Sequence, residues 1–203
     1  NSGRPLDLSW EDENIPTIIQ AWQLGSRSGE AIAKVLYGDY NPSGKLTMSF
    51  PRNVGQVPIY YNFKNTGRPS TSIEQVTNSG YADVENSALY PFGHGLSYTK
   101  FSYTDVILDK TELTLKSKIT LSFKIKNIGT VKGTEITQMY IRDVVGSIAR
   151  PMRELKGFKV IELNPGESKV VNFEINAKLL EFYSYNNKCC LLYTSDAADD
   201  MQC

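Results

Sequence analysis

The stretch KITLSFKIKN, residues 118–127, carries an apolar side chain at every second position. This alternation is typical of a β-strand that buries one face. Three further stretches of the same kind follow, and the Pro-Gly turn of NPGES separates the last two: GTEITQMYIRD (133–143), LKGFKVIEL (155–163) and KVVNFEI (169–175). Short strands at this spacing predict an antiparallel β-sandwich, which we place between residues 101 and 188.

Upstream of residue 101 the apolar residues follow a different period. Ile15, Ile18, Ile19 and Trp22 are spaced i, i+3, i+4, i+7, which predicts an amphipathic helix with Pro16 in its first turn. A second helix is expected from Ser28, a favourable N-cap, to a stop at Gly38. Its apolar face consists of Ala31, Ile32, Val35 and Leu36.

A predicted strand, KLTMSF (residues 45–50), follows the turn-rich stretch GDYNPSGK. These elements suggest part of an α/β layer that needs partners outside this chain. From Pro51 to Lys100 the sequence is rich in Pro, Gly, Asn and Tyr, as expected of a long connection between domains. The expected fold class is therefore α+β: an incomplete α/β sandwich segment, then an immunoglobulin-like sandwich.

The composition excludes several classes of protein. The 22 basic and 22 acidic residues balance, so no overall field favours nucleic acid. No apolar run approaches the roughly 20 residues that a membrane span requires. The first residues, NSGRPLDLSW, do not have the pattern of a signal peptide.

All three cysteines, Cys189, Cys190 and Cys203, lie in the last fifteen positions. The preceding sequence therefore contains neither a disulfide framework nor a cysteine-based zinc site. The closing run CCLLYTSDAADDMQC differs in character from everything before it, and we expect residues 189–203 to be a non-native tail.

Three motifs come close to a known catalytic or phosphate-binding pattern. GSRSG (residues 25–29) has Arg27 where a nucleophile elbow needs serine, and DYNPSGKLT has Asp39 where a phosphate loop needs glycine. Both are expected to be turns. His94 is the single histidine, in PFGHGLSYTKF (91–101), and a Ser-His-Asp triad could use no other. We expect His94 to be a structural or subsite-rim residue and its loop to be an interdomain joint.

Carboxylates and aromatic residues suggest a sugar site less directly. A glycosidase needs two carboxyl groups about 5 Å or more apart on opposite sides of the sugar. Glu11, Asp12 and Glu13 are sequence neighbours and fit a solvated helix entry better; Asp39, Asp83 and Glu85 lie near loops. The aromatic residues of the loop could face a sugar or pack between domains: Tyr60, Tyr61, Phe63, Tyr81 and Tyr90.

Three blocks of the sequence resemble family 3 glycoside hydrolases, especially bacterial periplasmic β-glucosidases. They are GRPLDLSW…PIYYN (residues 3–62), LYPFGHGLSYTKF (89–101) and IKNIGTVKG…NPGES (125–168). The resemblance covers residues 1 to about 188 in order. It departs from the family after SYNNK, which leaves an unpaired edge in the last domain.

The resemblance implies residues 1–60 as the end of an α/β sandwich domain, 61–100 as a linker and 101–188 as a fibronectin type III-like domain. In the family an upstream (β/α)8 barrel carries the aspartate nucleophile, and the sandwich domain supplies the glutamate acid/base before the point where this chain begins. No catalytic residue is therefore assigned here, and Glu11, Glu13 and Glu30 are not nominated. No metal or cofactor is expected, and substrate-binding residues stay unassigned.

Two functional hypotheses remain open. The first is a fragment, inactive alone, of a retaining exo-acting β-glucosidase, periplasmic or secreted, that acts on β-glucosides or oligosaccharides; β-xylosidase is the alternative specificity. The second is a stand-alone fibronectin type III-like module that binds carbohydrate or protein without catalysis. The aromatic loop suits both.

Overall fold

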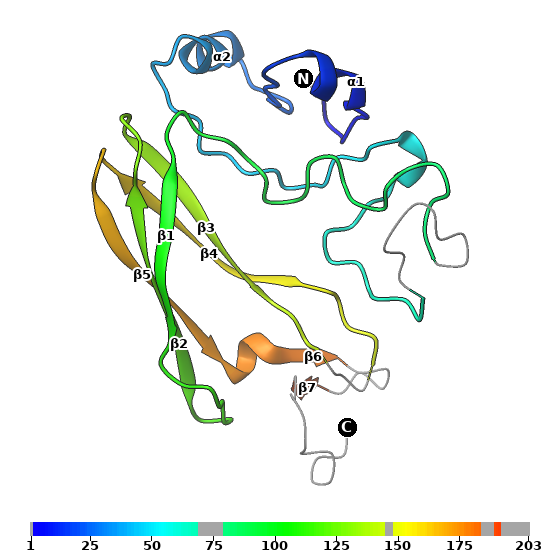
Figure 1. The fold of residues 1–203 in the computed structure, drawn as a ribbon, viewed down its shortest axis with the longest axis vertical. Coiled ribbons are helices and arrows are strands. Elements are labelled where there is room, and N and C mark those ends of the chain that lie inside the picture. The colour runs from blue at the N-terminus through cyan, green and yellow to red at the C-terminus, as the bar shows by residue number, and fades with distance from the viewer. Residues whose placement is uncertain (1, 69–78, 145–147, 184–188, 192–203) are drawn as a thin grey trace. The chain divides into compact units, whose positions relative to one another are not determined.

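The computed structural model describes residues 2–68, 79–144, 148–183 and 189–191 (Figure 1). The chain divides into two compact units, Asn1–Ser97 and Tyr98–Cys203. Each unit is described by itself below. The boundary falls within the stretch 91–101 that holds His94, and the domain boundaries expected from sequence stay a proposal.

The N-terminal unit contains the helices α1 (Ser9–Asn14) and α2 (Ser28–Leu36) and the 3-10 helix η1 (Val54–Gln56). The helix predicted over residues 15–22 is wrong, because α1 ends before it and residues 15–22 form neither helix nor strand. Proline disfavours the helical conformation for the residue before it, and Ile15 has φ −121° and ψ 124°. Pro16 therefore marks the end of a helix and not the first turn of one.

The second predicted helix is confirmed as α2. Gly38 stops it with φ +81°, a conformation that glycine adopts without strain, and its N–H donates to the carbonyl of Val35. Arg27, not Ser28, is the N-cap, and no side chain caps the helix. Arg27 and Lys34 both bond to Glu30 and lower the pKa of its carboxyl, with Lys34 the larger cause.

The strand predicted over residues 45–50 is not formed. Only one isolated antiparallel bridge, Phe50 to Tyr90, occurs there. The alternation expected of a half-buried strand fails at Met48, which is 47% exposed. The backbone bends at Thr47 and Met48, and the partner of Phe50 is a loop some 40 residues downstream, which the sequence pattern could not show.

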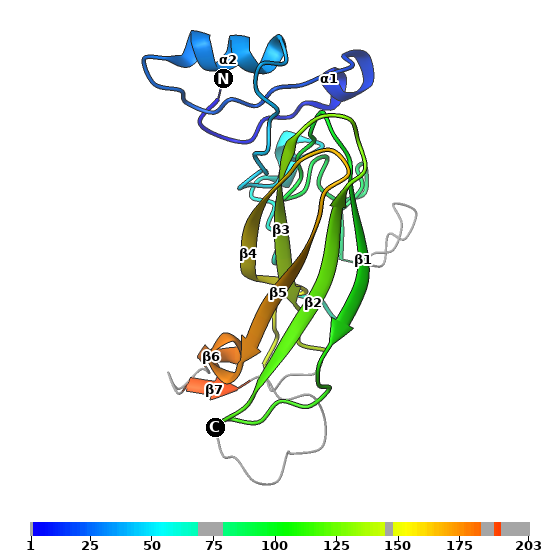
Figure 2. The same cartoon turned by 90° about the vertical axis from the view of Figure 1, so that its left-hand side faces the viewer.

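The C-terminal unit is a β-sandwich, as the alternation of apolar residues predicted (Figure 1, Figure 2). One sheet has the order β1-β2-β5 and the other contains β3 and β4, and all neighbours are antiparallel. The bounds are β1 Phe101–Leu108, β2 Lys118–Asn127, β3 Gly133–Ile141, β4 Glu154–Leu163 and β5 Ser168–Asn176. The 3-10 helix η2 (Ala177–Leu180) leads to β6 (Glu181–Tyr183), which pairs with β7 (Cys189–Leu191).

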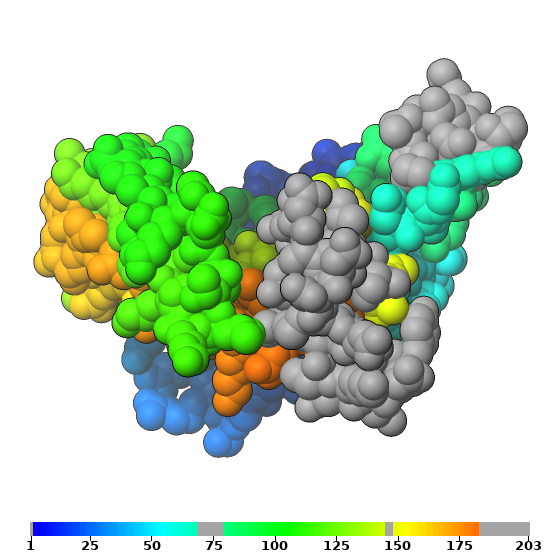
Figure 3. Space-filling view, turned by 90° about the horizontal axis from the view of Figure 1, so that it is seen from below, coloured from blue at the N-terminus to red at the C-terminus, as the bar shows by residue number. Residues whose placement is uncertain are grey.

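The strands keep a continuous register except at two irregularities. β2 pairs with β5 without interruption from Lys118–Asn176 to Lys126–Ser168. The register of β1 shifts between Thr104 and Ile107, and Asp105 there has φ +56°. In space-filling form green atoms of the β1–β2 region lie beside orange atoms of the β5 region, and in the sheet order β2 is the neighbour of β5 (Figure 3).

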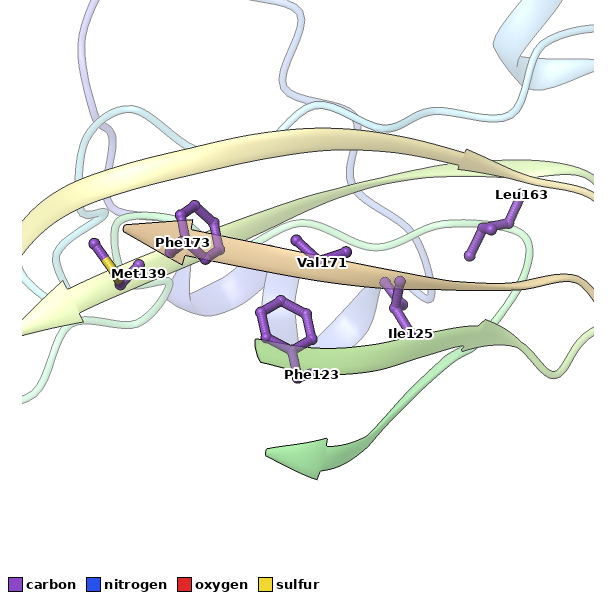
Figure 4. Close-up of a cluster of buried hydrophobic side chains, with 6 residues drawn as sticks. All are labelled: Phe123, Ile125, Met139, Leu163, Val171 and Phe173. Atoms are coloured by element: carbon purple, nitrogen blue, oxygen red, sulfur yellow. The ribbon is translucent and has the colours of Figure 1, made fainter. Parts of the chain in front are cut away.

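The core lies between the two sheets. Its buried side chains point inward from both of them (Figure 4): Phe123, Ile125, Met139, Leu163, Val171 and Phe173. Each fully buried side chain of this kind stabilises the fold by about 1.5–3 kcal/mol. Tyr103 of β1 also links the sheets, since its hydroxyl donates to Glu135 of β3 at 3.0 Å. Burial and the nearby carboxylate raise the pKa of Tyr103.

A buried amide joins the strand ends at one end of the sandwich. Asn127 is 0% exposed, and its Nδ2 donates to the carbonyls of Val131 and Leu163 at 2.8 and 3.1 Å. Its Oδ1 accepts from the Thr99 hydroxyl at 2.6 Å and from the Gly129 N–H at 3.1 Å. A Cβ on Gly129 would lie 2.3 Å from the Thr99 hydroxyl oxygen, so only glycine fits there.

We expect Asn127→Ala to lower the free energy of unfolding by about 2–4 kcal/mol, because it removes four hydrogen bonds of a side chain that is 0% exposed. Urea denaturation, followed by circular dichroism of the backbone, measures the change. Asn172→Ala, on the exposed side of β5, is the matched control and should change the value by less than about 0.5 kcal/mol. Equal effects of the two variants would contradict the role of the buried amide.

Residues 192–203 lie outside the described residues, so the expectation of a non-native tail stays a prediction. Among the described residues, no helix is both long and apolar enough to cross a bilayer.

Candidate functional site

The loop around His94 is held by backbone hydrogen bonds to residues 46–50. Leu46 exchanges two bonds with this loop: its N–H donates to the His94 carbonyl, and its carbonyl accepts from Gly93, each at 2.7 Å. The Phe50 N–H donates to the Tyr90 carbonyl at 2.8 Å. Phe50 is 1% exposed and packs against Trp22, with ring centroids 5.8 Å apart. A buried anchor therefore fixes the backbone of the loop.

The two glycines that flank His94 have separate structural roles. Gly93 has φ +82°. A Cβ on Gly95 would lie 2.3 Å from the carbonyl oxygen of Gly44, so the two backbones cross in close contact. Lys45 reinforces the crossing by donating from Nζ to the Gly95 carbonyl at 3.0 Å. The lysine of the phosphate-loop near miss thus bonds to this turn.

The His94 imidazole is half-buried and stacks on the Tyr90 ring at a centroid distance of 5.4 Å. Burial lowers the pKa of His94, and the charge of Lys45 lowers it further. The ring is therefore neutral near pH 7, and protonation on acidification costs stability. Within the described ranges the imidazole forms no hydrogen bond or ion pair with a serine or a carboxylate, the partners that a triad requires.

One carboxylate reaches this loop. Asp12 Oδ1 accepts a short hydrogen bond from the Tyr90 hydroxyl, although the two residues are 78 positions apart. Burial, followed by the bond to Asp12, raises the pKa of Tyr90 to about 12. Tyr90 thus stays protonated and holds Asp12 as a hydrogen-bond acceptor. Of the neighbouring acidic residues 11–13, the structure brings only Asp12 to the aromatic rings.

The other candidate carboxylates are used elsewhere or lie apart. Glu85 pairs with Arg52 at 3.2 Å. Asp39 and Asp83 are exposed loop residues. In the part of the chain that the structure describes, no group of three or more His, Cys, Asp or Glu could hold a metal ion.

The aromatic residues of the long loop divide into two groups. Tyr61 stacks on Phe92 at a centroid distance of 4.2 Å and an interplanar angle of 16°, which ties residues 60–63 to the His94 loop. Tyr60, Phe63 and Tyr81 are instead exposed, by 64%, 54% and 40%. Some aromatic rings of the loop are therefore packed and others are exposed, so both alternatives that the sequence left open remain.

Sequence reasoning missed a capping box in the connection after Pro51. The Asn53 side chain accepts from the Gly55 N–H, and the Gln56 side chain accepts from the Asn53 N–H. Gln56 is 1% exposed, and its Nε2 donates to the Glu85 carbonyl at 2.7 Å. The pattern Asn-x-x-Gln was a readable signal for this turn. The connection is therefore an ordered structure pinned to residues 85–87.

Two protein families match parts of this chain. Residues 1–98 match the family described as "Glycosyl hydrolase family 3 C-terminal domain", and residues 135–195 match the "Fibronectin type III-like domain". The two matches together define the C-terminal region of a carbohydrate-cleaving hydrolase. The chain belongs to glycosyl hydrolase family 3.

Two relatives show how far the similarity extends. A "Periplasmic beta-glucosidase" of Salmonella typhimurium is 47% identical over 92% of this chain and 25% of its own length. A "Beta-xylosidase" of Formosa agariphila is 44% identical over 86% of this chain and 23% of its own. The chain thus spans about a quarter of the length of the relatives it matches.

A solved structure agrees with the sequence comparison. The crystal structure of a β-glucosidase from Listeria innocua in complex with glucose is 39% identical, with a TM-score of 0.87. The match covers 93% of this chain and 26% of that one. An incomplete α/β sandwich segment followed by a fibronectin type III-like domain is therefore the architecture of this chain.

We expect Gly95→Ala to destabilise the N-terminal unit by about 1–3 kcal/mol, because the new methyl group overlaps a backbone carbonyl. Gly29→Ala is the matched control: nothing lies within 4 Å of its Cβ position in α2. It should stabilise by about 0.5–1 kcal/mol, as alanine favours a helix over glycine. Thermal denaturation monitored by Trp22 fluorescence distinguishes them, and a Gly95→Ala midpoint equal to that of the parent chain would contradict the crossing.

Proposed function

We propose that this chain is the C-terminal part of a retaining, exo-acting β-glucosidase that hydrolyses terminal non-reducing β-D-glucosyl residues. The similarity to a β-glucosidase over 92% of this chain, at 47% identity, carries the proposal. In a retaining mechanism a carboxylate attacks the anomeric carbon and a second carboxyl group protonates the leaving oxygen. Water then releases the sugar from the covalent glycosyl-enzyme.

Neither catalytic carboxylate is assigned to this chain. A retaining enzyme needs two carboxyl groups about 5–5.5 Å apart, facing the same sugar. The carboxylates described here are engaged differently: Asp12 accepts from Tyr90, and Glu85 pairs with Arg52. We therefore place both catalytic groups in the part of the parent enzyme that precedes residue 1 of this chain.

The His94 loop then has a supporting function in the parent enzyme. Its backbone is fixed by Leu46 and Phe50, and its imidazole is neutral and stacked on Tyr90. These features suit a structural or subsite-rim residue. The exposed rings of Tyr60, Phe63 and Tyr81 are apolar faces of the kind that pack against a sugar or a neighbouring domain.

Two refinements of the proposal rest on the relatives. A periplasmic or secreted location follows the name of the Salmonella relative. β-Xylosidase activity is the second candidate, because a Formosa β-xylosidase is nearly as similar. A stand-alone binding module is disfavoured, because similarity to the glycosidases extends through residues 1–98 as well as the sandwich.

The purified 203-residue chain should release no para-nitrophenol from its β-glucoside or β-xyloside above the buffer rate. The physical reason is that no described pair of carboxylates flanks a common site. The parent enzyme, expressed with its upstream sequence, is the positive control, and its ratio of the two substrates decides the sugar. Turnover by the short chain that persists through repurification and disappears in Asp12→Asn would contradict the proposal.

A further inference from the structure

Two lysines of β2 differ from the other lysines of the sandwich strands. Lys124 and Lys126 are exposed, and among the described residues neither side chain forms an ion pair or a hydrogen bond. The other strand lysines each have a partner: Lys118 pairs with Glu174, Lys156 with Glu154, Lys169 with Glu167, and Lys159 lies over the Phe173 ring. The two unpaired ammonium groups of these strands therefore lie close together on β2.

Lys124 and Lys126 point to the outer side of the sheet β1-β2-β5. Ile125, which stands between them, is 0% exposed and belongs to the core. Successive side chains of a strand point to opposite faces, so the two lysines leave the sheet on the side away from the core. The rise of a strand places their Cα atoms about 7 Å apart. Both ammonium groups therefore stand on one outer surface.

A third exposed lysine lies on the same side. Lys100 stands directly before β1, between Thr99, which is buried, and Phe101, which packs on the core. The same alternation places its side chain on the outer side. The Ile128 N–H donates to the Lys100 carbonyl at 2.9 Å, which continues the pairing of β1 with β2. We call this group of three the cationic face: Lys100, Lys124 and Lys126.

Protection of a sheet edge does not explain the lysines of β2. Natural sheets often place lysine on an edge strand, where its charge prevents pairing with another molecule. β2 is instead the central strand, paired with β1 on one side and with β5 on the other (Figure 2). Lys124 and Lys126 therefore stand in the middle of the sheet, where no edge needs protection.

Among the described residues, no carboxylate forms an ion pair with the cationic face. The strands β1, β2 and β5 carry two acidic residues, Asp105 and Glu174. Glu174 pairs with Lys118 at 2.6 Å. Asp105 lies in the register shift of β1 and accepts from the Thr104 hydroxyl at 3.2 Å. The face therefore presents a local positive potential in a chain whose net charge is zero.

Hydroxyl groups flank the two lysines of β2. Four cross-strand neighbours share the outer side with them: Ser102 and Ser168 beside Lys126, and Thr104 and Val170 beside Lys124. A hydroxyl both donates and accepts hydrogen bonds. Val170 is 68% exposed and adds apolar surface. Such a surface suits a sugar chain, whose rings have hydroxyl groups at their edges and apolar C–H groups on their faces.

The spread of the charges indicates a polymeric partner. The three ammonium groups follow the strand direction, whereas the donors that bind a small anion surround it in a concave site. A lipid surface is recognised by clusters of about four to eight basic residues, or by a basic helix with a broad apolar side. Three lysines among hydroxyl groups on a sheet fit neither pattern. An acidic polysaccharide supplies both the negative charges and the hydroxyl groups that match this surface.

We propose that the cationic face binds an acidic polysaccharide, one whose sugars carry carboxylate groups. The carboxylates pair with the lysine ammonium groups, and sugar hydroxyls bond to Ser102, Thr104 and Ser168. The inference goes beyond the proposed function, because it concerns the sandwich and needs neither catalytic carboxylate. The 203-residue chain itself is therefore the protein in which it is tested.

Isothermal titration calorimetry with polygalacturonate, a polymer of uronate sugars, tests the binding. At an ionic strength of about 0.1 M, where charges beyond about 10 Å are screened, the chain should bind this polymer and should not bind dextran, a neutral polysaccharide. Lys124→Gln combined with Lys126→Gln should weaken the binding about ten-fold or more, because two ammonium contacts are lost. Absence of binding to polygalacturonate would overturn the inference.

Two matched pairs of substitutions separate the cationic face from net charge and from folding. Lys110→Gln with Lys116→Gln removes the same charge from the exposed loop 109–117, and the affinity should change by less than about two-fold. Equal weakening by the two glutamine pairs would overturn the inference, since net charge would then explain it. Lys124→Arg with Lys126→Arg keeps the charge and should retain binding, and loss of binding in this folded variant would contradict the role of the ammonium charge.

Vesicles that contain phosphatidylglycerol test a membrane as the alternative partner. The chain should bind polygalacturonate more tightly than it binds these vesicles. Vesicle binding that depends on Lys124 and Lys126, without binding of polygalacturonate, would overturn the inference in favour of a lipid surface. The outcome is independent of glycosidase activity, so this proposal and the proposed function fail separately.

Discussion

The sandwich depends on the carboxamide of Asn127, because this one buried side chain forms hydrogen bonds near the ends of three strands. Its oxygen accepts hydrogen bonds from the Thr99 hydroxyl, just before β1, and from the Gly129 N–H. Its nitrogen donates to the carbonyl of Val131, just before β3, and to that of Leu163, at the end of β4. The Asn127 backbone also bonds to Gly166 and Glu167, in the turn before β5. A buried amide with all its groups paired specifies one arrangement of these ends, since any other leaves polar groups unpaired.

The same logic of close backbone contact organises the N-terminal unit. There the crossing of Gly44 and Gly95 takes the place of the buried amide, and Lys45 spans it. Both units thus use glycine where two segments approach too closely for a side chain. His94, between its two glycines, is held in place by this crossing, and its neutral ring stacks on Tyr90.

The sequence predicted the sandwich well, because alternation over residues 118–127 admits only one period. The helix predicted over residues 15–22 was wrong for a physical reason. An apolar run can match helical spacing by chance, and Pro16 can begin one helix or end another. The strand at 45–50 failed because its partner is a loop. The Tyr90–Asp12 bond joins residues 78 positions apart and has no local signal, whereas the capping box at Asn53 had one.

The catalytic chemistry could be inferred only through the family. Spacing alone set aside the near misses at residues 25–29 and at Lys45, and it left the acidic residues 11–13 without a role. The structure connects Asp12 to the loop that holds His94 through the Tyr90 hydroxyl. We therefore propose that this chain supports a glycosidase whose catalytic groups lie upstream.

The coding sequence immediately upstream of Asn1 tests this claim most directly. We expect one uninterrupted reading frame that encodes, upstream of Asn1, a (β/α)8 barrel with an aspartate nucleophile. A start codon or a signal peptide directly before Asn1 would contradict it and would leave a binding module in place of an enzyme.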